Sequence, residues 1–250
     1  MGVSINTRKI VGLKANTTAF GPDGYKNAYS IIFDGVDEYL ESASLAPEFG
    51  TGNWTINFWM YRTSNSGAQR ILSKSGGSDS IISILVTNAG AMQFISGLWN
   101  DGDGTNSPGT NTWEMWTYSV DRSGNAIWYK NGANPNSKTV SSISGSFGGG
   151  SGTIFRFGRN EASSYNFAGN LDEISIWSKA LSASEIADLY NSGVPTDLLT
   201  SAPAANLINW FRMGDPGGTG SYPTISDAKG SIDMTMTNMA AANITTNVPT

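Results

Sequence analysis

Two aspartates separated by one residue stand in a polar, glycine-rich stretch, residues 101–106, with sequence DGDGTN. This spacing begins the calcium-binding loop of EF-hands, in which a glutamate at the twelfth position completes the set of oxygen ligands. Here the twelfth position is Thr112, which excludes an EF-hand. Two interpretations stay open, an irregular calcium site formed by Asp101 and Asp103 or an acidic turn without metal, and the pattern favours the turn.

Aromatic residues beside polar loops could bind sugars, because the C–H faces of a sugar ring stack on aromatic rings while Asn and Asp bind its hydroxyl groups. Trp99 precedes Asn100, Asp101 and Asp103, and Tyr165 lies in a second polar loop. We predict these residues as glycan contacts. The alternative is that the aromatic rings pack inside the protein or against another subunit.

Residues 54–61, WTINFWMY, alternate in a way that predicts a strand with two different faces. The even-numbered positions carry large apolar side chains and are expected to face the core. Trp59 and Tyr61 stand on the opposite face and are further candidate glycan contacts. The alternative for this pair is burial beneath a helix, the N-terminal segment or a neighbouring subunit.

The chain of 250 residues has no cysteine and no histidine. The absence of Cys excludes disulfides, thiolate nucleophiles and metal sites with Cys ligands. The absence of His excludes a Ser-His-Asp triad, an imidazole base and His-ligated metals. Any metal would need oxygen ligands, which indicates calcium or magnesium. Acid–base chemistry would depend mainly on Asp, Glu, Lys or Tyr.

The composition is typical of an all-β protein with many turns and a neutral polar surface. Charged residues make up 14% of the chain, against a usual ~25%, and 30 residues are Gly. The net charge is −5 and no basic run is present, so we expect no nucleic-acid partner. No stretch approaches ~18 consecutive apolar residues, so we expect no membrane insertion.

The fold class predicted from the sequence is all-β, a two-sheet antiparallel β-sandwich with one short α-helix. Turn residues separate the apolar segments, and Asn131-Gly132 is the strongest signal for a hairpin. The strands are predicted at residues 29–33, 54–61, 70–73, 80–86, 92–96, 113–120, 126–130, 154–157, 171–177, 206–213 and 232–237.

The predicted helix begins after Ser182, which forms a capping box with Glu185. Ile186 and Leu189 then share one face, and Gly193 indicates where the helix ends.

Residues 1–27 are polar and show no strand or helix pattern, whereas residues 28–250 are predicted to form one β-sandwich domain. The N-terminal segment is either a free tail or an arm that docks on a neighbouring subunit. We predict a docked arm, and with it a symmetric homo-oligomer.

The sequence resembles laminin-G-like jelly rolls of the concanavalin A-like lectin/glucanase superfamily. Residues 32–40 (IFDGVDEYL) resemble the family's opening, and residues 71–74 (ILSK) and 128–132 (WYKNG) match its middle. Residues 169–177 (GNLDEISIW) are the most specific motif. The resemblance covers about residues 29–240 and implies two antiparallel sheets, one of them concave, packed face to face.

The resemblance also implies a structural calcium ion. Its ligands would be Asp34, in a Phe-Asp-Gly motif, and Asp172, on the late strand that carries the family's motif. The alternative is that both carboxylates only accept hydrogen bonds from turns and backbone N–H groups.

The superfamily that the sequence resembles includes glucanases and lyases, and their catalytic residues are not matched in this chain. Retaining glucanases of this fold carry acids at alternate positions of one strand, because residues i and i+2 point into the same cleft. Here Asp172 and Glu173 are adjacent, so we expect them to point to opposite faces. Lyases of this fold use a His or Tyr base, and His is absent. We therefore predict that the protein is not an enzyme.

The favoured function is that of a non-catalytic virion surface protein, decorating a capsid or tail. Its partners would be glycans on a host cell surface and, through the arm, neighbouring virion subunits. The expectation of a virion rests on the lectin-like resemblance, the docked arm and the absence of an export signal after Met1. The first alternative is a secreted or cell-surface carbohydrate-binding module, and the second is a glycoside hydrolase or polysaccharide lyase.

Overall fold

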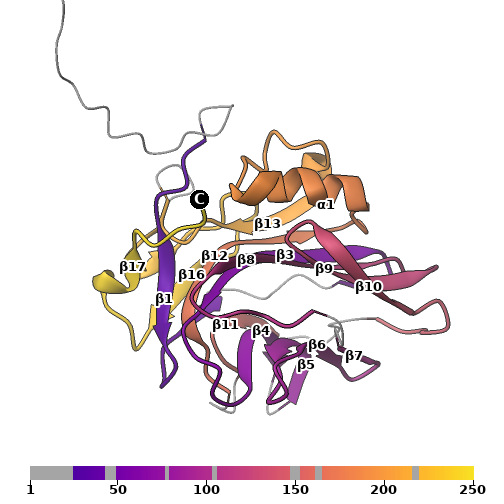
Figure 1. The fold of residues 1–250 in the computed structure, drawn as a ribbon, viewed down its shortest axis with the longest axis horizontal. Coiled ribbons are helices and arrows are strands. Elements are labelled where there is room, and N and C mark those ends of the chain that lie inside the picture. The colour runs from indigo at the N-terminus through magenta and orange to yellow at the C-terminus, as the bar shows by residue number, and fades with distance from the viewer. Residues whose placement is uncertain are drawn as a thin grey trace, which may run out of the picture.

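The computed structural model describes residues 25–42, 49–76, 79–102, 106–146, 153–160, 165–215 and 220–250. In these segments the chain forms two antiparallel β-sheets packed face to face, with one short α-helix outside the sandwich (Figure 1). The predicted fold class is thereby confirmed.

The first sheet has the strand order β10-β9-β8-β3-β12-β1-β17, and β13 pairs with the second half of β12. β3 and β12 lie at its centre. Its strands are β1 (Ser30–Asp34), β3 (Trp54–Arg62), β8 (Trp113–Val120), β9 (Asn125–Lys130), β10 (Ala133–Thr139), β12 (Ala168–Trp177), β13 (Leu207–Phe211) and β17 (Ile244–Thr245).

The second sheet has the strand order β14-β15-β16-β2-β11-β4-β5-β6-β7. Its strands are β2 (Tyr39–Ser42), β4 (Gln69–Gly76), β5 (Asp79–Val86), β6 (Met92–Ser96), β7 (Asn100–Gly102), β11 (Ile154–Phe157), β14 (Gly220–Ser221), β15 (Thr224–Ile225) and β16 (Met234–Thr237). Single 3₁₀ turns lie in the connections at Asn191–Gly193, Ala204–Asn206 and Ala241–Asn243.

The main hydrophobic core lies between the two sheets. The inward-facing residues of β3 are all buried in it, as the alternation in the sequence predicts, and they are Trp54, Ile56, Phe58 and Met60. Burying one such large side chain contributes about 1.5–3 kcal/mol to stability. The stability of the sandwich therefore comes mainly from the inward-facing apolar side chains of its strands.

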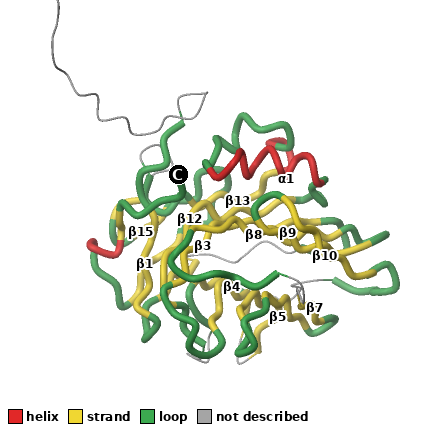
Figure 2. The backbone as a smooth tube through the Cα atoms, in the orientation of Figure 1, coloured by secondary structure: helices red, strands yellow, loops and turns green. Residues whose placement is uncertain are grey.

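A second hydrophobic cluster covers the outer face of the first sheet. Helix α1 (Ala183–Tyr190) lies over this face (Figure 2). It buries Ile186 and Leu189 against Trp177 and Trp210 of the sheet. In the described part of the chain, no helix lies over the outer face of the second sheet (Figure 1). The two outer faces of the sandwich thus differ in what covers them.

The capping box predicted for the helix is present. Ser182 Oγ accepts a hydrogen bond from Glu185 N, and Glu185 Oε2 accepts one from Ser182 N at 2.9 Å. The helix ends at Asn191, whose φ of 43° lies in the left-handed region.

Replacing the capping serine should destabilise the protein measurably. Ser182→Ala is expected to lower the free energy of unfolding by about 1 kcal/mol, because one backbone N–H at the helix start loses its acceptor. Urea denaturation followed by circular dichroism would measure the loss. Ser66→Ala, in an exposed loop, is the control and should change stability by less than about 0.5 kcal/mol. Equal effects of the two variants would contradict the capping role.

The predicted Asn131-Gly132 turn joins β9 to β10 in a two-residue hairpin. Both residues have positive φ, 53° and 71°, which is the conformation that a type I′ turn requires. The sequence does not predict β10, because its residues, ANPNSKT, show no apolar alternation. It is an edge strand with mostly exposed side chains, so backbone pairing with β9 alone defines it.

No helix among the described residues is long and apolar enough to cross a membrane.

Candidate functional site

The outer face of the second sheet carries polar and aromatic side chains. In β11 the core residues Phe155 and Phe157 alternate with Arg156, which therefore points outward. Arg156 Nε forms an ion pair with Glu41 Oε2 of β2 at 2.6 Å. Its Nη1 also donates a hydrogen bond to Ser75 Oγ of β4 at 3.0 Å. These contacts tie three neighbouring strands together on the outer face of the second sheet.

The loop that follows β11 returns the chain to β12 and is fixed at its base. Gly158 N donates to Ile71 O at 2.9 Å, and Phe167 N donates to Gly158 O at 2.8 Å. Arg70 N donates to Tyr165 O at 2.6 Å, which holds the end of the loop against β4. Residues 161–164 lie outside the described residues.

Two arginine–tyrosine pairs lie at this loop. The guanidinium carbon of Arg159 is 3.7 Å from the centre of the Tyr39 ring, so the planar group stacks on the ring. The guanidinium carbon of Arg70 is 5.6 Å from the centre of the Tyr165 ring. The Tyr165 side chain is 49% exposed. The loop therefore presents a half-exposed aromatic ring next to the positive charge of Arg70.

Some hydrogen-bonding capacity at the loop is not used by the protein. Arg159 Nε and Asn166 Oδ1 have no hydrogen-bond partner among the described residues, although Asn166 Nδ2 donates to Val36 O. An unpaired buried donor or acceptor costs roughly 1–3 kcal/mol, which a ligand that supplies the partner would recover. We call Tyr39, Arg70, Arg159, Tyr165 and Asn166 the loop site.

Of these residues, only Tyr165 is among the glycan contacts predicted from the sequence. The alternation around Arg156 could have indicated the outward-facing side of β11. No local pattern indicates that Tyr39 and Arg159 meet, because the contact depends on the pairing of β2 with β11. The loop site is thus a product of sheet topology.

Trp59 is 3% exposed and lies beneath helix α1, where it stacks on Tyr190 with ring centres 5.7 Å apart. The prediction that Trp59 contacts a glycan is therefore wrong for this structure, and the alternative of burial beneath the helix is correct. Tyr61 is half-buried beside Trp113, with ring centres 5.7 Å apart. Its role as a glycan contact stays a prediction.

Trp99 is half-buried at the edge of the sandwich. Its ring lies 6.2 Å from the Tyr118 ring, and Lys138 Nζ lies 5.4 Å from its centre. It belongs to the turn between β6 and β7, whereas Tyr165 is held by β4, two strands from β6. The two rings therefore do not form one platform.

The two residues that follow Trp99 differ in exposure to solvent. Asn100 is exposed, and its carbonyl oxygen accepts a hydrogen bond from Lys138 Nζ at 2.9 Å. Asp101 is buried and accepts one from the Tyr118 hydroxyl at 3.1 Å. It points into the sandwich, so the prediction that a glycan contacts it is wrong for this structure. Asp103 lies outside the described residues, so the second calcium candidate stays a prediction.

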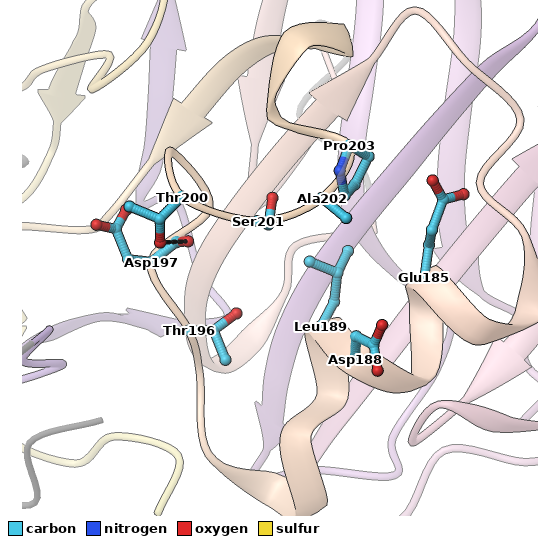
Figure 3. A pocket seen from close by; sticks show the side chains of 9 residues that line it. All are labelled: Glu185, Asp188, Leu189, Thr196, Asp197, Thr200, Ser201, Ala202 and Pro203. Atoms are coloured by element: carbon cyan, nitrogen blue, oxygen red, sulfur yellow. Dashed lines mark hydrogen bonds between the residues drawn. The ribbon is translucent and has the colours of Figure 1, made fainter. Parts of the chain in front are cut away.

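A small pocket lies away from the loop site, between helix α1 and residues 196–203 (Figure 3). Its volume is about 160 Å³, and carboxylates of Glu185, Asp188 and Asp197 line it. Glu185 is already engaged in the capping box and in an ion pair with Lys179. The pocket thus combines a small volume with negative charge, and no exposed aromatic ring lines it.

Comparison with known families agrees with this architecture. The sequence model of the concanavalin A-like lectin/glucanases superfamily matches residues 34–187, which is more than half of the chain. The chain belongs to this superfamily. A search of curated proteins finds no match to the sequence.

Two solved structures of other proteins have a fold similar to that of this superfamily member. A Bacteroides ovatus protein to which carbohydrate binding has been ascribed has a TM-score of 0.69 and 18% identity over 90% of this chain. The chain spans 62% of that protein's length. The heptameric SAP-like pentraxin of Limulus polyphemus has a TM-score of 0.54 and 14% identity, over 66% of this chain and 82% of the pentraxin. At such identities the likeness concerns the fold alone.

Asp34 and Asp172 do not form the calcium site that the resemblance implies. Asp34 pairs with Ala168, four residues before Asp172 on β12, so about 13 Å of strand separates the two positions. Asp34 Oδ1 accepts a hydrogen bond from Val36 N at 2.7 Å. Asp172 accepts hydrogen bonds from Glu173 N at 2.8 Å and from Asn27 Nδ2 at 2.9 Å. Each carboxylate thus accepts hydrogen bonds as the alternative interpretation describes, and the two do not lie together as ligands of one ion.

No group of three or more acidic residues suited to hold a metal ion occurs in the described parts of the chain. Calcium binding by this superfamily member stays a prediction.

Asp172 and Glu173 point to the same side of β12, and the prediction that they face opposite sides is wrong. The pairing of β12 with β3 is interrupted between Asp172 and Ser175, and Glu173 has a φ of 49°. These are features of a β-bulge, in which an extra residue turns a side chain away from its regular face. Both carboxylates therefore contact the N-terminal segment outside the first sheet.

These carboxylates belong to a buried charged cluster. The Tyr25 hydroxyl donates to Glu173 Oε1, and Trp210 Nε1 donates to Glu173 Oε2 at 2.5 Å. Arg212 Nη2 contacts Asp215 Oδ2 at 3.1 Å, and its Nε lies 3.8 Å from Glu173 Oε1. Burial raises the pKa of Glu173 to about 7, and burial also raises the pKa values of Asp172 and Asp215. Among the described residues, this cluster of three acids thus holds one cation, Arg212, which contacts Glu173 and Asp215.

The cluster anchors the chain where the predicted arm ends. Asp215 Oδ1 accepts hydrogen bonds from Ala28 N and Tyr29 N at 2.7 and 2.8 Å. Tyr25 and Asn27 contact Glu173 and Asp172 of β12, so residues 25–27 dock on this chain's own first sheet. Residues 1–24 lie outside the described residues, so docking of the arm on a neighbouring subunit stays a prediction.

Proposed function

We propose that this protein is a non-catalytic carbohydrate-binding module, and that a glycan binds at the loop site on the outer face of the second sheet. The observation that carries the proposal is the exposed ring of Tyr165 beside Arg70, with unused hydrogen-bonding groups on Arg159 and Asn166. A sugar needs this combination of a flat apolar surface and nearby polar groups.

The rest of the molecule supports this location. Helix α1 covers the outer face of the first sheet, where it buries Trp59. No helix of the described part of the chain lies over the outer face of the second sheet, where Glu41 of β2 and Arg156 of β11 form an ion pair. The likeness in fold to a protein with an ascribed carbohydrate-binding role is consistent with the proposal.

The buried acids argue for a binding role without hydrolysis. A glycosidase places two carboxyl groups about 5–9 Å apart on either side of an accessible glycosidic bond. Asp172 and Glu173 are adjacent, but both are buried beneath the N-terminal segment. Release of reducing sugar from a polysaccharide panel would contradict the proposal and favour a glycoside hydrolase or lyase.

A glycan array, run with and without EDTA, tests binding and any dependence on calcium together. Tyr165→Asn is expected to weaken binding of the best array ligand about tenfold, because it removes the stacking surface. Asparagine tolerates the φ of 62° at this position, so the backbone should keep its conformation. Tyr165→Phe keeps the ring and should retain most of the affinity.

Leu199→Ala is the control for this experiment, because Leu199 is similarly exposed, at 47%, and lies in the loop after helix α1. It should leave affinity unchanged. If Tyr165→Asn binds as tightly as the wild type, the loop site is not the binding site. If no glycan binds to the wild type, the role is architectural.

The biological setting of the module is part of the proposal. A place on a virion surface is one setting, and a secreted or cell-surface module is the alternative that the fold fits equally well. Mass spectrometry of purified particles and of culture supernatant distinguishes the two, since a virion protein should remain with the particles.

A further inference from the structure

The loop site gathers positive charge on a protein whose net charge is −5. Arg70, Arg156 and Arg159 stand on or beside the same outer face, formed by β2, β4 and β11. The acid that contacts these arginines among the described residues is Glu41, which forms an ion pair with Arg156. Arg156 is thereby neutralised, whereas no acid among the described residues contacts Arg159.

Resting on the proposed function, we infer that the loop site recognises an acidic glycan, one whose sugar carries a carboxylate or a sulfate group. Arg159 would bind the anion, and Tyr165 would stack against the sugar ring. This inference adds the chemical class of the ligand to the proposed binding role.

The position of Arg159 suits an anion better than a neutral hydroxyl group. Stacking on Tyr39 at 3.7 Å holds its guanidinium plane, so little side-chain entropy remains to be lost on binding. The guanidinium makes no hydrogen bond or ion pair within the described residues, and Nε is without a partner. A guanidinium fork matches the paired oxygens of a carboxylate or sulfate, and such charge-assisted hydrogen bonds are roughly twice as strong as neutral ones.

The overall negative charge limits the range over which the site can attract an anion. At physiological ionic strength, charges separated by more than about 8 Å are largely screened. Recognition should therefore depend on contact with Arg159 and its neighbours, and little on the net charge of the chain. A distant positive charge can be removed as a control for this distinction.

The test uses isothermal titration of the full chain with three probes, an oligogalacturonate, a galacto-oligosaccharide of the same length and a sulfated galactan oligosaccharide. We expect at least one acidic probe to bind about tenfold more tightly than the neutral one. The affinities for the oligogalacturonate and for the sulfated galactan oligosaccharide show which anion is preferred. Arg159→Gln is expected to remove the preference while binding of the neutral probe persists.

Lys229→Gln is the matched control, because Lys229 is exposed and its loss changes the net charge by the same amount. It should retain the preference for the acidic probe. Arg159→Lys keeps the charge without the planar fork and should show an intermediate preference. Thermal unfolding of each variant checks that it is folded.

The outcomes separate the two proposals. Equal affinity for acidic and neutral probes would overturn the inference and leave the carbohydrate-binding role standing. An equal loss in Arg159→Gln and Lys229→Gln would also overturn it, because overall charge would then be the cause. Absence of binding by every probe, and by every glycan of the array, would count against the proposed function itself.

Discussion

The protein is expected to be more stable near pH 5 than near pH 8, and the buried acids of the first sheet are the reason. Burial raises the pKa of Glu173 from 4.5 to about 7. Asp172 and Asp215 have pKa values raised in the same direction by the same cause. Within the described segments Arg212 is the one cation in contact with this cluster, through Glu173 and Asp215, so at least one acid favours its protonated form.

The direction of the effect follows from proton linkage. Between pH 4.5 and about 7 the folded protein holds a proton on Glu173 that the unfolded chain has released, so the free energy of unfolding falls as the pH rises. One pKa unit corresponds to about 1.4 kcal/mol, so the shift of Glu173 amounts to roughly 3 kcal/mol over this window. The pKa values of Glu185 and Asp121 are lowered, so these two groups reduce the free energy of unfolding as the pH falls. Their effect appears only below their ordinary pKa values and so lies outside this window.

Urea denaturation at several pH values between 5 and 8 measures this slope. Glu173→Gln is expected to flatten it, because the titrating carboxyl is gone. The same variant should be less stable at pH 5, since one amide cannot accept from both the Tyr25 hydroxyl and Trp210 Nε1. Asp188→Asn, on the exposed side of helix α1, is the control and should keep the wild-type slope. A free energy of unfolding that rises from pH 5 to pH 7 would contradict the prediction. It would show that the acids of the cluster are ionised in the folded protein.

Replacement of Arg212 is expected to cause the largest loss of stability among single charge substitutions. Arg212→Met should lower the free energy of unfolding by about 3–5 kcal/mol at pH 8, because it leaves buried carboxylates without a cation. The loss also includes the hydrogen bond to Lys26 O at 2.9 Å and the packing of the guanidinium against the Tyr25 ring at 4.5 Å. Denaturation at pH 8 and at pH 5 measures both the loss and its dependence on protonation.

The loss in Arg212→Met should be smaller at pH 5, where the acids can take up protons and become neutral. Lys179→Met is the control, because Lys179 pairs with Glu185 on the surface, and an exposed pair contributes about 1 kcal/mol or less. A loss in Arg212→Met that is the same at both pH values would contradict an electrostatic cause and indicate lost packing alone.

The features that the sequence predicted correctly are set by neighbours along the chain. The alternation of residues 54–61 predicted the inner stripe of β3, because side chains of a strand point to opposite faces with a period of two. The capping box at Ser182 and the Asn131-Gly132 turn were predicted because hydrogen bonds and φ angles within a few residues define them.

The features that the sequence could not predict depend on segments far apart in the chain. Trp59 and Trp54 both stand on β3, and only the packing of helix α1 decides that the outward-facing ring is buried as well. The bulge at Glu173 brings two adjacent acids to one side, which regular strand geometry forbids. Calcium binding, the oligomeric state and a place on a virion stay predictions.

The sequence by itself determined the fold class and the exclusion of His and Cys chemistry, because both follow from residue types and local periodicity. Only the tertiary structure decided which face of the sandwich helix α1 covers and which residues meet on the other face. Tyr39, Arg70 and Arg159 come from β2, β4 and the loop after β11, and sheet pairing alone makes them neighbours. The physical reason is that strand order depends on long-range packing, which a local pattern does not record.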